Sequence, residues 1–139
     1  DRWVELGILE GNSSFSDLPQ SINYDDVHSG SVKQRARAWL DVNCANCHQL
    51  GGPAETSGLF LEFEQLNSRA LGVMKPPVAA GRGSGDHKYN IFPGYPDKSI
   101  MVYRINSTDP GIMMPELGRQ LVHKEGLDLI RQWIKEMNP

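Results

Sequence analysis

The chain has 139 residues, of which 39% are hydrophobic and 22% are charged, and its formal net charge is −3 at neutral pH. This length suits a single hydrophobic core, and the slightly acidic balance argues against a nucleic-acid partner. No apolar run approaches the ~18 residues of a membrane-spanning helix, so we expect no transmembrane segment in this chain.

The first thirty residues predict an extension rather than a part of the main core. Residues 2–10 are weakly amphipathic and predict a short helix. Residues 12–30 are polar and rich in turn formers, and predict a loop. We therefore expect residues 1–30 to form a short helix and a loop, followed by one domain over 31–139.

Residues 31–47 give the clearest helical pattern in the N-terminal half. Either Ser29 or Ser31 can cap the start of this helix. Four of its polar residues are expected to face water: Lys33, Gln34, Arg35 and Arg37. The opposite face repeats with helical spacing and is expected to be buried: Val32, Ala36, Trp39, Leu40 and Asn43.

The rest of the chain predicts two more helices between long irregular segments. Residues 49–95 carry many glycines and prolines and predict a loop. Within it, residues 81–85 (Gly-Arg-Gly-Ser-Gly) resemble a phosphate-binding loop. They lack its Lys-Ser/Thr, however, and therefore predict a flexible loop. Residues 97–106 predict a helix, and 107–119 predict a loop. Residues 123–137 predict the last helix, with one buried stripe: Leu127, Ile130, Trp133, Ile134 and Met137.

Residues 44–48 read Cys-Ala-Asn-Cys-His and contain both cysteines of the chain. The pattern Cys-x-x-Cys-His is the attachment signature of haem c. Two thiols three residues apart lie on one face of a helical turn, where Cys44 and Cys47 can each add to a haem vinyl group. His48 then lies beside the ring and can bind the iron. The motif therefore predicts one covalently bound haem c.

Three other interpretations of this motif compete with haem attachment. Structural zinc usually takes four Cys or His ligands, whereas the other three histidines are scattered singly along the chain: His28, His87 and His123. A dithiol redox pair lies at a helix N-terminus, where the thiol pKa is lowered, but here a helical pattern precedes the cysteines. The third interpretation is a structural disulfide between the two cysteines. The specificity of the pentapeptide favours haem.

A haem iron held by His48 has a second axial side, and methionine is the ligand that gives high reduction potentials. Met101 and Met137 lie on helical stripes and are expected in the core. Met113 and Met114 lie in the 107–119 loop, directly before a proline that stiffens the chain. We expect Met114 to bind the iron, with Met113 next; another methionine, a histidine or an open site are the remaining alternatives.

This order of features resembles class I cytochrome c: a helix that ends in Cys-x-x-Cys-His, a loop, a further helix, a Met-Pro loop and a C-terminal helix with a tryptophan. The resemblance implies an all-α fold of about four helices, with long loops wrapped around one haem, and makes 31–139 a cytochrome c domain. It also implies that the helix carrying Trp39 crosses the helix carrying Trp133.

A narrower resemblance covers nearly the whole chain. Residues 35–44, 93–100 and 109–119 are similar to the haem-binding entry, the "PGDPDxS" helix start and the methionine loop of a bacterial family of exported cytochrome-like domains, which close longer proteins or are fused to other modules. The last match places Met114 at the Met-Pro position. Tyr95 departs from the pattern, which usually has an aspartate helix cap there.

Residues around the haem are implied by the same resemblance. A ligating histidine normally donates its other ring nitrogen to a carbonyl, and in class I cytochromes this is a proline carbonyl after the motif, here that of Pro53. The haem propionates need donors. Five side chains are eligible, and Arg119 is favoured because it is nearest in sequence to the methionine loop: Arg82, Lys88, Tyr89, Arg104 and Arg119.

The combined features predict a monohaem c-type cytochrome with His48 and Met114 as axial ligands. We expect it to be an electron-transfer protein rather than an enzyme, passing one electron between exported redox proteins or to a fused redox enzyme domain. The alternative is a haem protein that binds peroxide or a gas at a weak sixth position; the Met-Pro loop and the lack of an evident distal acid–base pair argue against it.

Haem c is attached outside the cytoplasmic membrane, so we expect a periplasmic or otherwise exported bacterial protein. The chain opens Asp1-Arg2-Trp3-Val4, without the basic start and apolar stretch of a signal peptide. We therefore expect either a processed mature protein or a fragment of a longer exported one.

Overall fold

A computed structural model describes residues 2–10 and 20–138 of the chain. In chain order its helical elements are α1 (Arg2–Glu5), α2 (Val32–Leu40), the π-helical turn η2 (Asp41–Ala45), the 3-10 turns η3 (Glu55–Ser57), η4 (Gly81–Ser84) and η5 (Pro96–Lys98), α3 (Ile100–Ile105) and α4 (Lys124–Glu136). Extended pairing in the described part is limited to the isolated bridges Val73–Ile91 and Tyr89–Ser99. The described chain is therefore helical, in agreement with the all-α prediction.

Helix α2 begins as the sequence predicts. Ser31 is the cap: its hydroxyl accepts a hydrogen bond from the Gln34 amide, and the Gln34 side chain accepts one from the Ser31 amide at 3.0 Å. This reciprocal pair satisfies two donors that a helix start leaves free. The regular α-helix ends at Leu40, earlier than predicted, and the wider turn η2 continues it to Ala45.

The prediction that Arg37 faces water is wrong. Its side chain is buried, and its guanidinium donates to the backbone carbonyls of Glu62, Phe63 and Gln65. Those carbonyls belong to the loop that follows the Cys-x-x-Cys-His motif. A cation buried on α2 therefore fixes that loop by satisfying backbone acceptors that regular secondary structure does not satisfy.

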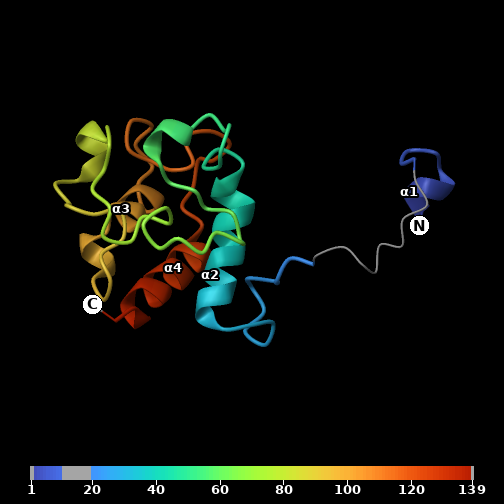
Figure 1. The fold of residues 1–139 in the computed structure, drawn as a ribbon, viewed down its shortest axis with the longest axis horizontal. Helices are drawn as coiled ribbons and strands as arrows, with labels where there is room; N and C mark the ends of the chain where they lie inside the picture. Colours follow the sequence, from blue (N-terminus) through green and yellow to red (C-terminus); the bar gives the residue numbers. More distant parts are fainter. Residues whose placement is uncertain (1, 11–19, 139) are drawn as a thin grey trace.

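Helices α2 and α4 cross and form the centre of the core, as Figure 1 shows. Ala36, Trp39 and Leu40 of α2 and Ile130 and Ile134 of α4 are each at most 2% exposed. The crossing is close at Gly126, where a β-carbon would lie 2.2 Å from Trp39 Nε1. The expected pairing of the Trp39 face with the last helix is thus present, and it requires a glycine in the first turn of α4.

The third predicted helix begins later than expected. Pro96 opens the 3-10 turn η5, Ser99 is extended (φ −102°, ψ 125°), and α3 starts only at Ile100. The Ser99 hydroxyl, fully buried, donates to the Tyr95 carbonyl at 3.0 Å and accepts from the Phe92 amide at 2.9 Å. The break is therefore an ordered turn, in which a serine bonds the backbone that a continuous helix would have satisfied.

The long segment 49–95 is irregular, as predicted, apart from η3 and η4. It contributes three apolar side chains to the core: Leu61, Leu71 and Ile91. The segment 81–85, predicted to be flexible, instead forms the turn η4, with Gly83 buried. The loop from 107 to 119 is also confirmed as lacking helix.

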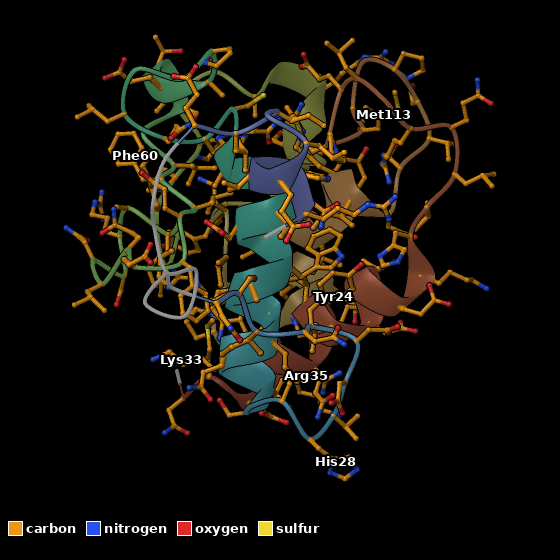
Figure 2. All side chains as sticks on the ribbon, turned by 90° about the vertical axis from the view of Figure 1, so that its right-hand side faces the viewer. Tyr24, His28, Lys33, Arg35, Phe60 and Met113 are labelled. Atoms are coloured by element: carbon orange, nitrogen blue, oxygen red, sulfur yellow. The ribbon has the colours of Figure 1, made fainter. Side chains whose placement is uncertain are left out.

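Within the described part of the N-terminal extension, residues 2–10 and 20–30, the helix is limited to Arg2–Glu5, and none of the residues of α1 is buried. Figure 1 shows α1 apart from the body formed by α2, α3 and α4. Positions 12–19 of the predicted loop lie outside the described residues. Tyr24, within the predicted extension, packs on the core, and Figure 2 shows it beside α2, whereas His28 and Lys33 point outward. No helix in the described ranges has the length and apolar character required to cross a membrane.

Candidate functional site

The Cys-Ala-Asn-Cys-His motif forms the end of the α2–η2 helical unit. Cys44 lies in η2, and its carbonyl accepts hydrogen bonds from the amides of Cys47 (3.1 Å) and His48 (2.9 Å). The chain then turns sharply at Gly52, where a β-carbon would lie 2.5 Å from the Cys47 carbonyl oxygen. Two thiols and an imidazole thus lie on one short helical turn.

The two cysteines are free thiols in different surroundings, Cys44 half-buried and Cys47 exposed. Burial, and to a lesser extent the nearby Cys47, raises the pKa of the Cys44 thiol to about 12. Dithiol redox motifs rely on the opposite shift, produced by a helix N-terminus. The position of the motif at the end of a helical unit, rather than at its start, therefore separates it from a dithiol redox pair.

The zinc interpretation also lacks support from the ligand geometry. Within residues 2–10 and 20–138, no group of three or more Cys, His, Asp or Glu side chains gathers in a way that could hold a metal ion. Structural zinc requires four such ligands. The donor set present, two thiols, one imidazole and a methionine loop, fits haem c, whose ring supplies four of the six iron ligands.

His48 is held by the segment that follows the motif. Its Nδ1 lies 3.2 Å from Ser57 Oγ, and its carbonyl accepts from the Leu61 amide at 2.8 Å. The pKa of His48 is lowered chiefly by burial and then by the charge of Arg104; a hydrogen bond with the Leu59 backbone and the charge of Glu116 oppose this. A neutral imidazole is the form that binds a metal.

Ser57 is not predicted from the sequence, because nothing in the pattern marks a hydroxyl nine residues after the motif as its partner. Pro53, the predicted carbonyl acceptor for His48, is exposed and lies in the same turn, between Gly52 and η3. Its role toward a bound haem stays a prediction.

The methionine loop meets the motif at a hollow of about 300 Å³. Met114, Pro115, Asn43 and Asn46 are among the residues that line it, and Asn46 lies between the two cysteines. Cys44, Cys47 and His48 themselves do not line it. Met113 is half-buried but does not line this hollow. Figure 2 shows Met113 toward the end of α2 opposite to Lys33, the end that leads into the motif.

The other methionines lie as their patterns predict or away from the hollow. Met101 is in the core, and Met137 packs against it. Met74 is 41% exposed. His87 packs edge-to-face on Tyr103.

The other methionines, His28 and His87 do not line the hollow shared with the motif, but His123 does. The Nδ1 of His123 accepts hydrogen bonds from Trp39 Nε1 at 3.1 Å and from the Gly126 amide at 3.2 Å.

Arg119 joins the end of the methionine loop to the end of α3. It donates to the carbonyls of Ile105 (2.8 Å), Arg104 (3.2 Å) and Ser107. Its Nε is buried and has no hydrogen-bond partner among the described residues. This free donor is compatible with the predicted contact to a propionate, which stays a prediction.

Comparison with known proteins gives no relative: no protein-family model, curated protein or solved structure matches the chain. The site is therefore interpreted from its own chemistry and geometry.

Proposed function

We propose that the chain is a monohaem c-type cytochrome that transfers single electrons. Cys44 and Cys47 are the attachment thiols, and His48 and Met114 are the axial ligands. The observation that carries this proposal is the hydrogen-bonded turn that holds Cys44, Cys47 and His48. Asn46 of the same turn lines one hollow with Met114, 68 positions away in the sequence, although the two thiols and the imidazole do not line it.

Each residue of the site has a distinct task in this proposal. The turn closed by the Cys44 carbonyl holds both thiols and the imidazole on one short segment, and Ser57 orients the His48 ring through Nδ1. The bound haem supplies a Fe(III)/Fe(II) couple. The protein supplies the two axial ligands, excludes water from part of the ring, and leaves a surface for a transient redox partner.

The proposal extends to location and partners. Haem c is attached outside the cytoplasmic membrane, so the protein is placed in the periplasm or another exported compartment. Its partner is an exported redox protein or a redox enzyme domain in the same polypeptide.

Covalent attachment tests the proposal. The chain is expressed with a periplasmic leader and the cytochrome c maturation system, and the purified protein is run on a denaturing gel and stained for haem. We expect a haem-positive band, with haem retained after extraction with acid acetone. A Cys44→Ala/Cys47→Ala control should give a colourless band. A wild-type band without stain would contradict the proposal.

Visible spectra separate the electron-transfer function from the alternative. A six-coordinate His/Met haem should show no change on adding carbon monoxide to the reduced protein at low ligand excess. Rapid carbon monoxide binding together with peroxide turnover would favour the ligand-binding haem protein instead.

A further inference from the structure

Arg104 lies at the junction of three segments that surround the candidate site. It occupies the last turn of α3, which ends at Ile105, and Ile105 lines the same hollow as Met114. Arg104 contacts the methionine loop twice. Its Nε donates to the Ile112 carbonyl at 2.8 Å, and its own carbonyl accepts from the Met114 amide at 3.1 Å.

The Arg104 side chain also lies close to a glycine of the neighbouring turn. It extends across η4, where a β-carbon at the buried Gly83 would lie 3.2 Å from the guanidinium carbon. The glycine-rich segment therefore leaves room for a cation to lie against backbone. This contact accounts for Gly83, one of the three glycines in the segment 81–85.

The Arg104 guanidinium is a half-buried charge. Burial lowers its pKa, and the carboxylate of Glu116, two residues after Met114, raises it. An arginine stays protonated under all ordinary conditions, so the charge is permanent. Since Glu116 is exposed and Arg104 is half-buried, water screens the carboxylate more than the guanidinium.

We infer that Arg104 is a positioning residue whose fixed positive charge, held against the methionine loop at the Ile112 carbonyl, raises the reduction potential of the haem. This inference rests on the proposed function. Oxidation adds one positive charge at the iron, and a nearby cation disfavours that charge more when it is partly removed from water. The reduced state is therefore favoured.

Coulomb's law sets the size of the expected change in reduction potential. A unit charge acting over about 10 Å at an effective dielectric constant near 20 changes a charge equilibrium roughly tenfold. We therefore expect Arg104→Gln to lower the Fe(II)/Fe(III) ratio at a fixed applied potential by about tenfold, which for one electron is a downward shift of about 59 mV.

Four variants and the wild-type protein are compared by redox titration of the haem absorption. Arg104→Gln should lower the potential, and Arg104→Lys, which keeps the charge, should restore most of it. Glu116→Gln removes an opposing charge at an exposed position and should raise the potential by a smaller amount. Arg131→Gln, which breaks an ion pair with Asp97 on η5, is the matched control and should leave the potential unchanged.

The outcomes separate the inference from the proposed function. Equal potentials for the wild type and Arg104→Gln, or equal decreases for Arg104→Gln and Arg104→Lys, would overturn the role of the charge while leaving the haem assignment intact. If Arg104→Gln fails to fold, a Glu116→Gln protein whose potential is unchanged or lowered overturns the inference. Absence of covalent haem from the wild type would instead refute the proposed function.

Discussion

The α2–α4 pair and the methionine loop, residues 107–119, are stabilised in different ways. The helices bury apolar side chains against each other, with Trp39, Ile130 and Ile134 almost inaccessible to water. The loop leaves Leu117 86% exposed and is held by arginine side chains that bond backbone or carboxylate. Hydrophobic burial thus stabilises the α2–α4 pair, whereas arginine side chains that bond carbonyls and a carboxylate hold the loop that carries Met114.

An arginine of α2 holds the loop after the motif in the same way. Arg37 bonds three carbonyls of the loop that follows the motif, just as Arg119 bonds three carbonyls at the end of α3. Backbone carbonyls of irregular segments have no ladder or helix partners, and a guanidinium offers several donors in a fixed fork. Loops that surround a candidate cofactor site can be ordered in this way without a larger core.

The largest expected effect is in the helical framework. Ile130→Ala removes a fully buried side chain from the α2–α4 contact and should cost about 2–5 kcal/mol of unfolding free energy, through lost burial and a residual cavity. Urea unfolding followed by far-UV circular dichroism measures it. Leu66→Ala, at a position 91% exposed, is the control and should have almost no effect. Equal costs at both positions would contradict the assigned core.

The next effect concerns the packing of η4 on α3. Gly85 has φ +56°, and a β-carbon there would lie 2.7 Å from the Tyr103 ring. Gly85→Ala should cost about 2–4 kcal/mol, from left-handed backbone strain and overpacking together. Gly81→Ala is the matched control, because Gly81 has φ +50° but a β-carbon there would meet no other atom within 4 Å. It should cost about 1–2 kcal/mol, from strain alone. A Gly81 variant as unstable as the Gly85 variant would show that η4 is not packed on Tyr103.

A smaller effect is expected for the buried cation of α2. Arg37→Met keeps an apolar stem but leaves three carbonyls without their donor, and should cost about 1–3 kcal/mol. Lys33→Met, on the exposed side of the same helix, controls for the lost charge and should change stability little. Chemical unfolding gives both values, and amide hydrogen exchange at residues 62–65 should accelerate only in the Arg37 variant.

The smallest effect is expected at the surface. Arg82 and Asp109 form a two-bond ion pair at 2.9 and 3.0 Å, but their side chains are 67% and 41% exposed. Arg82→Gln should therefore cost about 0–1 kcal/mol, and the difference from wild type should vanish at high salt. A loss comparable to that of Arg37→Met would mean that the methionine loop depends on its exposed contacts as well.

The sequence predicts those features that a local pattern determines. The apolar periodicity predicts α2 and α4, and the serines before α2 predict its start, although Ser29 and Ser31 are equal candidates for the cap. The spacing of Cys44–His48 predicts a turn with two thiols and an imidazole. The sequence does not predict Ser57 beside His48 or the burial of Arg37, because both depend on which loop segment folds back onto α2. The sequence also does not predict the interruption of the helix at Ser99. The apolar pattern of residues 97–106 is continuous, but the buried Ser99 hydroxyl donates to the Tyr95 carbonyl and stabilises a turn there.

The pairing of Met114 with the motif is the feature that the chemistry of the candidate site depends on most. Met114 and Met113 are adjacent, and both are half-buried, but only Met114 lines the hollow that contains Asn46. A thioether bound to ferric haem gives a weak sulfur-to-iron absorption band in the near infrared. The thioether also stabilises the reduced iron, so its loss lowers the reduction potential.

The near-infrared spectrum of the ferric protein therefore tests the central claim most directly, measured on the wild type, Met114→Ala and Met113→Ala. We predict that the band is present in the wild type, absent from Met114→Ala and retained in Met113→Ala, with a lowered potential in Met114→Ala alone. A band that survives Met114→Ala, or a haem-loaded wild type that lacks it, would contradict axial ligation by Met114.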